Sequence, residues 1–113
     1  MADCLFCKIA AGEIPSTKVY EDEYVYAFKD IDPQAPFHAV VIPKKHIGSA
    51  DEIESSNSIE VARVFEAIAK IAKQENLENG YRVVNNCGEE GGHTVHHMHF
   101  HLLARRNLAW PPG

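Results

Sequence analysis

The sequence predicts an α+β domain, in which a mostly antiparallel sheet of about five strands packs with one long and one short helix. Three observations lead to this fold class: a long apolar stripe with helical spacing, several short apolar or alternating runs, and turn-forming residues between them. The chain has 113 residues, of which 45% are hydrophobic and 24% charged. No repeat or linker divides it, so we expect a single domain over residues 1–113.

Two segments have the pattern of helices. A short helix is expected from about Leu5 to Ala11, and a long one from Ile59 to about Leu77. Asn57 and Glu60 have the spacing of a capping box before the long helix, and Gly80 is a stop signal after it. The apolar stripe of the long helix comprises Val61, Phe65, Ile68 and Ala72.

Five segments have the pattern of strands. The first two flank a polar run, as the strands of a hairpin do, and the third stops at Pro43, whose ring removes a ladder donor. A loop that holds three of the seven glycines, Asn86–Gly92, separates the last two. The expected strands are Lys18–Glu21, Tyr24–Phe28, Ala39–Ile42, Tyr81–Val84 and Val95–Leu103.

Composition excludes several classes of protein. No apolar run approaches the roughly 20 residues of a membrane span, and the N-terminus lacks the pattern of a secretory signal, so a cytoplasmic location without membrane association is expected. The net charge of −5 argues against a general nucleic-acid binder. Three cysteines are too few for a disulfide framework.

The histidines are unusually clustered. Five of the seven lie between His93 and His101, and the run His97–Leu103 alternates polar and apolar residues. In a strand, this alternation places His97, His99 and His101 on one face, with about 6.6 Å between successive residues of that face. The alternate apolar residues then point into the core, and three aligned imidazoles indicate chemistry rather than structure.

Two kinds of chemistry use such a row of imidazoles. Histidines at i and i+2 can bind one zinc ion, as in catalytic three-histidine sites. A neutral imidazole is also a good nucleophile near pH 7 and can form a covalent phosphoramidate with a phosphoryl group. The glycine-rich loop before the histidines supplies backbone N–H groups for phosphoryl oxygens, which favours phosphoryl chemistry over a zinc hydrolase.

The run His97–Leu103 resembles the His-φ-His-φ-His-φ-φ signature of the histidine triad (HIT) family, where φ is apolar. The resemblance covers nearly the whole chain and is greatest to the Hint branch of the family. It implies a HIT-like fold. The other matching segments are Asp30–His38, Ile42–His46, Gly91–Val95 and the ending Trp110–Gly113.

The resemblance implies an enzyme that cleaves purine nucleoside 5′-phosphoramidates through a covalent nucleotidyl-histidine. It also implies a homodimer whose two sheets join, with the extended tail around Trp110 approaching the partner's active site; a disordered C-terminus is the simpler interpretation. Cleavage of dinucleoside polyphosphates by the same nucleophile is the first alternative. A nucleotide-binding regulator with incidental catalysis is the second, and a catalytic zinc hydrolase the third.

The catalytic roles carried over by the resemblance fall on four histidines. His99 is the nucleophile, and His97 orients it. His101 contacts the phosphate and assists the leaving group, while His38 supports the same network. Taken alone, His38 has the simpler interpretation of a structural histidine.

The nucleotide contacts implied by the resemblance include His99 and His101 and six further residues, each of which has a simpler structural explanation. The apolar ones could be core, the Asp and Asn side chains could stabilise turns, and threonine is common in strands. In the implied roles, they hold the ribose hydroxyls, the base, the phosphate or the leaving group. The six are Asp30, Ile31, Asn86, Thr94, Phe6 and Ile9.

Two histidines depart from the family pattern. His93 stands where glutamine is common, and His96 where tyrosine or phenylalanine is common. His96 is expected to face away from the triad and to pack. His93 is expected on the leaving-group side, so it affects which substrate is preferred.

Cys4 and Cys7 form a pair with the spacing of half a zinc site. The family resemblance completes the set with His46 and His97. Four protein ligands close the tetrahedron, so the implied zinc is structural, and no metal is expected to be needed for the chemistry. The simpler interpretation is a pair of reduced, buried thiols.

Overall fold

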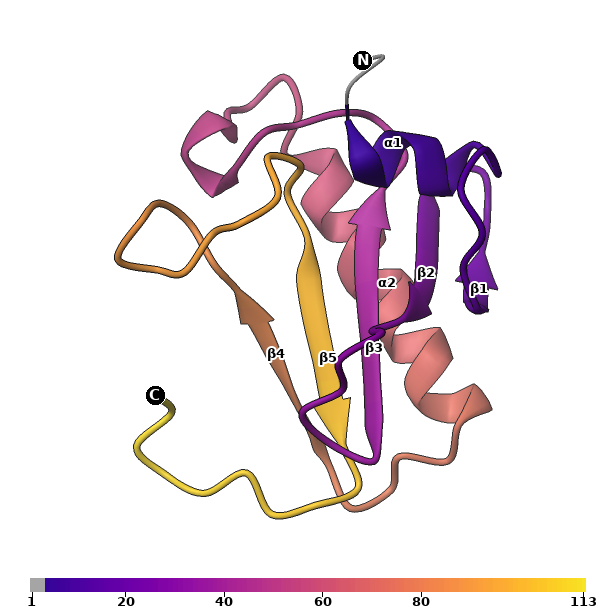
Figure 1. Ribbon diagram of the computed structural model, residues 1–113, viewed down its shortest axis with the longest axis vertical. Helices are drawn as coiled ribbons and strands as arrows, with labels where there is room; N and C mark the ends of the chain where they lie inside the picture. The colour runs from indigo at the N-terminus through magenta and orange to yellow at the C-terminus, as the bar shows by residue number, and fades with distance from the viewer. Residues whose placement is uncertain (1–3) are drawn as a thin grey trace.

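The computed structural model describes residues 4–113 and contains a five-stranded sheet with two α-helices and one short 3₁₀ turn, η1 (Figure 1). This confirms the predicted α+β class. Within those residues, no helix is both long and apolar enough to cross a membrane. In chain order the elements are α1 (Leu5–Ala10), β1 (Lys18–Glu21), β2 (Val25–Lys29), β3 (Phe37–Pro43), η1 (Ala50–Glu52), α2 (Ile59–Gln74), β4 (Tyr81–Asn85) and β5 (Phe100–Ala104).

The sheet is antiparallel throughout, and its strand order is β1-β2-β3-β5-β4. Strand β5 therefore lies between β3 and β4, although more than 50 residues separate it from β3 in the sequence. His101 on β5 is paired with Val40 on β3 and Val84 on β4. This position in the sheet interior holds the last histidine of the triad on a rigid support.

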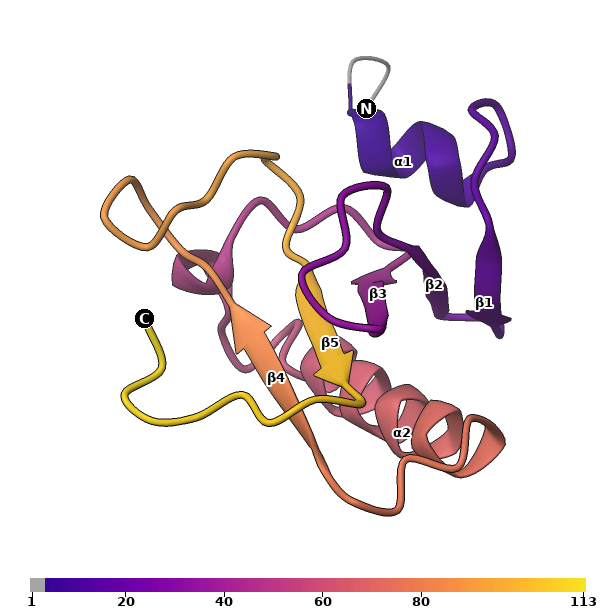
Figure 2. The same cartoon turned by 60° about the horizontal axis from the view of Figure 1, so that its bottom comes forward.

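The two helices cover opposite faces of the sheet, as Figure 2 shows. Alternate residues of β3 separate the faces: Ala39 and Val41 pack with α2, while Val40 and Ile42 pack with α1. Met98, Phe100 and Leu102 belong to the α2 side, as the alternation of the histidine run predicts. The histidine positions between them therefore face the side of α1.

The long helix begins at Ile59 as predicted, but its cap and its end differ from the prediction. It ends at Gln74 rather than near Leu77, because the chain turns there and Asn76 adopts a positive φ of 57°. The capping box is wrong: the residue before the helix is Ser58, and no side chain caps it. The Asn57 side chain instead accepts a hydrogen bond from the Glu54 backbone, and Glu60 pairs with Arg63.

The last strand is shorter than predicted. Strand β5 begins at Phe100 rather than at Val95, so His97 and His99 precede it. Met98 N–H donates to the Ile47 carbonyl and His97 N–H to that of Val95, which holds this segment outside the ladder. The alternation of core and site residues nevertheless continues through the irregular segment.

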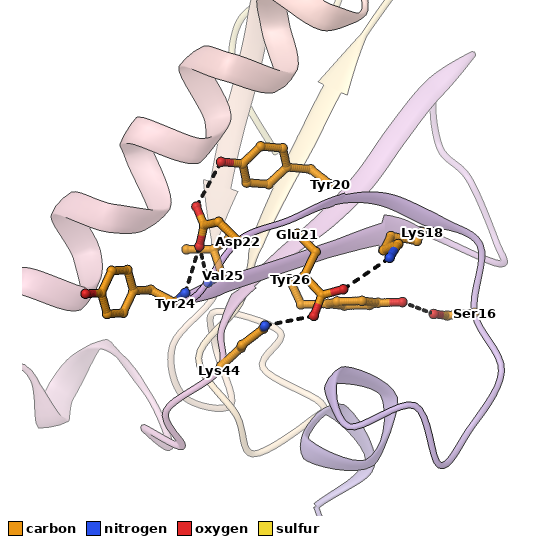
Figure 3. A network of polar contacts seen from close by, with 9 residues as sticks. All are labelled: Ser16, Lys18, Tyr20, Glu21, Asp22, Tyr24, Val25, Tyr26 and Lys44. Atoms are coloured by element: carbon orange, nitrogen blue, oxygen red, sulfur yellow. Dashed lines mark hydrogen bonds and ion pairs between the residues drawn. The ribbon is translucent and has the colours of Figure 1, made fainter.

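The hairpin of β1 and β2 is closed by polar side chains (Figure 3). One carboxylate oxygen of Asp22 accepts from the backbone N–H groups of Tyr24 and Val25, and the other accepts from the Tyr20 hydroxyl. Lys44 also pairs with Glu21 at 2.8 Å. These contacts fix β2, whose end leads directly into Asp30.

Candidate active site

A cleft of about 720 Å³ lies between α1, the end of β2 and the histidine segment, which comprises residues 93–101. All eight residues that the sequence predicted as nucleotide contacts line it, so the structure brings the whole predicted set together. Both catalytic and apolar residues share this cleft. The eight are Phe6, Ile9, Asp30, Ile31, Asn86, Thr94, His99 and His101.

His99 is held with one ring nitrogen toward the backbone. Its Nδ1 lies 2.7 Å from the His97 carbonyl oxygen, which can only accept, so Nδ1 carries the proton. The lone pair is then on Nε2, on the opposite side of a ring that lines the cleft. Burial lowers the pKa of His99, which keeps the imidazole neutral and nucleophilic at pH 7.

His38 and His101 form a hydrogen-bonded relay beside His99. His38 Nδ1 accepts from the Gln34 backbone N–H at 3.0 Å, so its proton is on Nε2, which donates to His101 Nδ1 at 2.8 Å. His101 is thereby left with a donor at Nε2. Burial lowers the pKa of both residues, so this arrangement is the neutral one. The ring of His101 lies 5.2 Å from that of His99.

Asp30 lies beside this relay, with Oδ2 at 3.4 Å from His38 Nε2 and 3.8 Å from His101 Nδ1. Its other oxygen accepts from the Asp32 backbone, as the simpler turn interpretation predicts. The ligand atoms of the three residues are close enough for a metal ion. However, the Gln34 N–H occupies the lone pair of His38 Nδ1, so Nε2 carries a proton and cannot be a ligand.

A second group of ligand atoms has the chemistry of a zinc site. Cys4, Cys7, His46 and His97 bring two sulfurs and two imidazole nitrogens within 4.8 Å of one another. Three of the S–N separations are 3.2, 3.3 and 3.5 Å. Tetrahedral zinc with ordinary bond lengths needs about 3.6 Å between S and N ligands. The residues present therefore fit a closed, four-ligand zinc site.

The tautomer of His97 suits a cation in this group, whereas the Cys7 thiol must lose its proton to bind one. His97 Nε2 donates to the Pro43 carbonyl at 2.8 Å, which leaves the lone pair of Nδ1 toward the sulfurs. Burial lowers the pKa of His97 to about 4, so the ring stays neutral. Burial and the neighbouring Cys4 raise the pKa of Cys7 to about 11. A bound cation would compensate the two thiolates, with release of protons.

His97 connects the two sites. Its ring belongs to the four-residue metal-binding group, and its carbonyl oxygen accepts a hydrogen bond from His99 Nδ1–H. The predicted orienting role of His97 therefore has a physical basis in its backbone oxygen. Phe6 on α1 also packs edge-on against His99, with ring centroids 5.0 Å apart.

Sequence reasoning missed part of the cleft wall. The missed residues are mostly apolar, and on a single sequence an apolar cleft residue has the same pattern as a core residue. The position of Phe28 and Lys29, directly before Asp30, is a signal that could have found two of them. The missed residues are Leu5, Pro15, Ser16, Thr17, Phe28, Lys29, Val40, Gly92 and Val95.

The two unusual histidines behave differently. The packing role predicted for His96 is wrong, because its side chain is 75% exposed and lies 3.8 Å from Glu52. His93 lies beside His99, with the two ring centroids 5.6 Å apart. Its Nε2 is buried without a hydrogen-bond partner among the described residues.

The C-terminal tail lies away from the cleft of its own chain. Arg82 on β4 holds it by donating to the carbonyl oxygens of Leu108 and Ala109. Trp110 is 80% exposed. Together with β4 and Arg105, the tail borders a second cavity of about 1010 Å³ that contains none of the triad histidines.

Comparison with known families agrees with this geometry. The family model described as "HIT domain" matches residues 11–108, which is most of the chain. The chain belongs to the HIT family. The resemblance inferred from the histidine run is therefore confirmed.

Relatives and solved structures of this HIT protein extend the comparison. A 14 kDa zinc-binding protein of Zea mays is 50% identical, over 96% of this chain and 87% of the relative. Adenylylsulfatase HINT1 of Arabidopsis thaliana is 42% identical, over 96% of this chain and 76% of that relative. A HIT family hydrolase of Legionella pneumophila superposes with a TM-score of 0.95 at 49% identity, covering 98% of this chain and all of that one.

Proposed function

We propose that this HIT family hydrolase cleaves purine nucleoside 5′-phosphoramidates, with His99 as the nucleophile. The observation that carries the proposal is the 2.7 Å hydrogen bond from His99 Nδ1 to the His97 carbonyl, which leaves Nε2 unprotonated beside the cleft. The Legionella hydrolase and the Arabidopsis adenylylsulfatase support hydrolysis of a nucleotide derivative.

In the first step, His99 Nε2 attacks the α-phosphorus, and the bond from phosphorus to the amine breaks. The amine takes up a proton from solvent as it leaves, and the nucleotidyl group becomes attached to His99; the water that reacts in the second step returns a proton to solvent. His101 Nε2–H and the Thr94 hydroxyl are donors placed along the same cleft wall. They stabilise the phosphoryl oxygens and assist departure of the leaving group.

In the second step, water attacks the nucleotidyl-histidine, and the bond between phosphorus and Nε2 breaks. The products of both steps are a nucleoside monophosphate and the free amine, from one phosphoramidate and one water. Asp30 accepts from the ribose hydroxyls, and Asn86 binds the phosphate side. Phe6, Ile9 and Ile31 enclose the base. Ile31 lines the cleft and its side chain is fully exposed, so it is available to pack on the base.

Zinc is proposed as a structural ion held by Cys4, Cys7, His46 and His97. The Zea mays relative is named as zinc-binding, and the ligand separations here fit that ion. When bound, it supplies a rigid cross-link between α1 and the histidine segment, not an open coordination position. The catalytic zinc alternative is therefore not favoured.

A panel of leaving groups tests the proposed reaction. The purified protein is expected to release AMP from adenosine 5′-phosphoramidate with a kcat/KM at least about tenfold above that for diadenosine polyphosphates. Adenylyl sulfate belongs in the panel because of the name of the Arabidopsis relative. AMP release is measured by chromatography. A preference for the dinucleotide would select the first alternative function instead.

We also propose a homodimer in which the β4 edges of two chains join the sheets. Strand β4 is an edge strand, and Tyr81 at its start is 44% exposed. Arg82 on this strand also holds the tail that carries the exposed Trp110. An unpaired edge together with exposed aromatic residues is typical of an association surface.

Light scattering coupled to gel filtration tests the dimer. The expected mass is twice the 12.6 kDa of the chain. Deletion of residues 108–113 is expected to weaken the dimer and to change the preference among leaving groups, because the tail is then lost from the partner's cleft. A mass of 12.6 kDa at micromolar concentration would contradict the proposal.

A further inference from the structure

A pair of hydroxyl groups lies beside a mostly apolar part of the cleft wall, whose polar neighbours are Thr17 and Lys29. Ser16 lines the cleft, and its Oγ lies 2.8 Å from the hydroxyl of Tyr26 (Figure 3). Tyr26 itself is buried, within the cluster that packs against α1. The neighbouring lining residues are Leu5, Phe6, Ile9, Pro15, Phe28 and Val40.

The backbone and the phenol together fix the position of this serine. The Lys29 N–H donates to the Thr17 carbonyl at 2.9 Å, so the chain at Ser16 runs beside the end of β2 that leads into Asp30. The Tyr26 ring is packed against that of Phe28, with centroids 6.0 Å apart. The Ser16 hydroxyl is thus preorganised rather than free to rotate away, which reduces the entropic cost of binding through it.

The hydrogen-bond capacity of the pair leaves one group for a ligand. Two hydroxyls have two protons, and one of them is used between Ser16 and Tyr26. Since the phenol is buried, it is best satisfied by donating to Ser16 Oγ. The proton of Ser16 is then not used within the pair, so it is available to a ring nitrogen or carbonyl oxygen of a ligand in the cleft.

We propose that Ser16, oriented by Tyr26, hydrogen-bonds the purine base and is a base-binding residue of this cleft. The inference rests on the proposed function, which assigns the histidine end to the phosphate and Asp30 to the ribose. The apolar wall then receives the base, and a few placed polar groups in an apolar cleft fix the orientation of a ligand. Both adenine and guanine offer acceptors to one hydroxyl.

The test compares nucleotides with a ligand that lacks the base. Affinities of AMP, GMP and ribose 5-phosphate are measured by calorimetry or NMR titration for the wild type, Ser16→Ala, Ser16→Thr and Tyr26→Phe. Ser16→Ala is expected to weaken the affinity for AMP and GMP by about 3- to 10-fold, and the affinity for ribose 5-phosphate by less than about twofold. Ser16→Thr keeps the hydroxyl and is expected to keep the affinity.

Tyr26→Phe is expected to weaken the affinity for AMP less than Ser16→Ala does. The double variant is expected to have the same affinity as Ser16→Ala alone, because the two changes act through one contact. Melting temperatures check that each variant is folded. Equal affinity of Ser16→Ala and the wild type for AMP and GMP would overturn the proposal. So would an equal loss for ribose 5-phosphate, which indicates a structural role. If the wild type binds no AMP, the proposed function itself has failed.

Discussion

Replacing His99 with alanine is expected to reduce the turnover of adenosine 5′-phosphoramidate by about 10³-fold or more. The variant loses the Nε2 lone pair proposed to attack phosphorus, and among the described residues that line the cleft no other imidazole is held by a carbonyl in the same tautomer. AMP binding is expected to change less than about fivefold, since the apolar wall and Asp30 remain. Steady-state kinetics and calorimetry measure the two effects.

His96→Ala is the matched control for this experiment. It removes an exposed imidazole that is three residues before His99 and does not line the cleft. Its activity is expected to stay within about twofold of the wild type. Substantial turnover by the His99 variant would mean that another group attacks phosphorus. A phenotype in cells that survives the loss of turnover would favour the regulatory alternative.

Loss of the metal-binding group is expected to have the largest effect on stability. Cys7→Ser is expected to lower the zinc content and to reduce the melting temperature on the order of 10 °C, because the bound ion stabilises only the folded state. The ligands join α1 to the segment that holds His99, so the cross-link closes a long loop. Elemental analysis and thermal unfolding measure both quantities.

Cys87→Ser is the control, since this thiol lies on the loop outside the metal-binding group. It is expected to retain the zinc content and the melting temperature of the wild type. Equal melting temperatures of the Cys7→Ser and Cys87→Ser variants would contradict a structural role of the ion. If chelation abolished turnover while the fold stayed intact, the catalytic zinc alternative would be correct.

Much of the fold follows from residue patterns that depend only on neighbours in the sequence. The alternation around Met98, Phe100 and Leu102 predicts which side packs on α2, and the structure confirms it. The alternation did not show where hydrogen bonding of β5 begins, since that depends on Ile47, a residue distant in the sequence. The capping box failed for a similar reason, because Asn57 has a closer partner in Glu54.

The site was predicted unevenly for the same physical reason. Asp30 and Thr94 are marked in the sequence by their match to the family's motifs rather than by their residue types, and they line the cleft as expected. Apolar residues such as Phe28 and Val40 carry no such mark. The relay from Gln34 through His38 to His101 needs two strands and a turn to be placed together, so only the structure reveals it.

The most direct measurement is the intact mass of the protein within seconds of mixing with an amine-linked AMP. A mass increase of one adenylyl group is expected, mapped by fragmentation to His99 and absent from His99→Ala. The adduct is expected to disappear as AMP accumulates, because water cleaves the phosphorus–nitrogen bond. Turnover without any adduct under rapid quenching, or an adduct on a different residue, would contradict nucleophilic attack by His99.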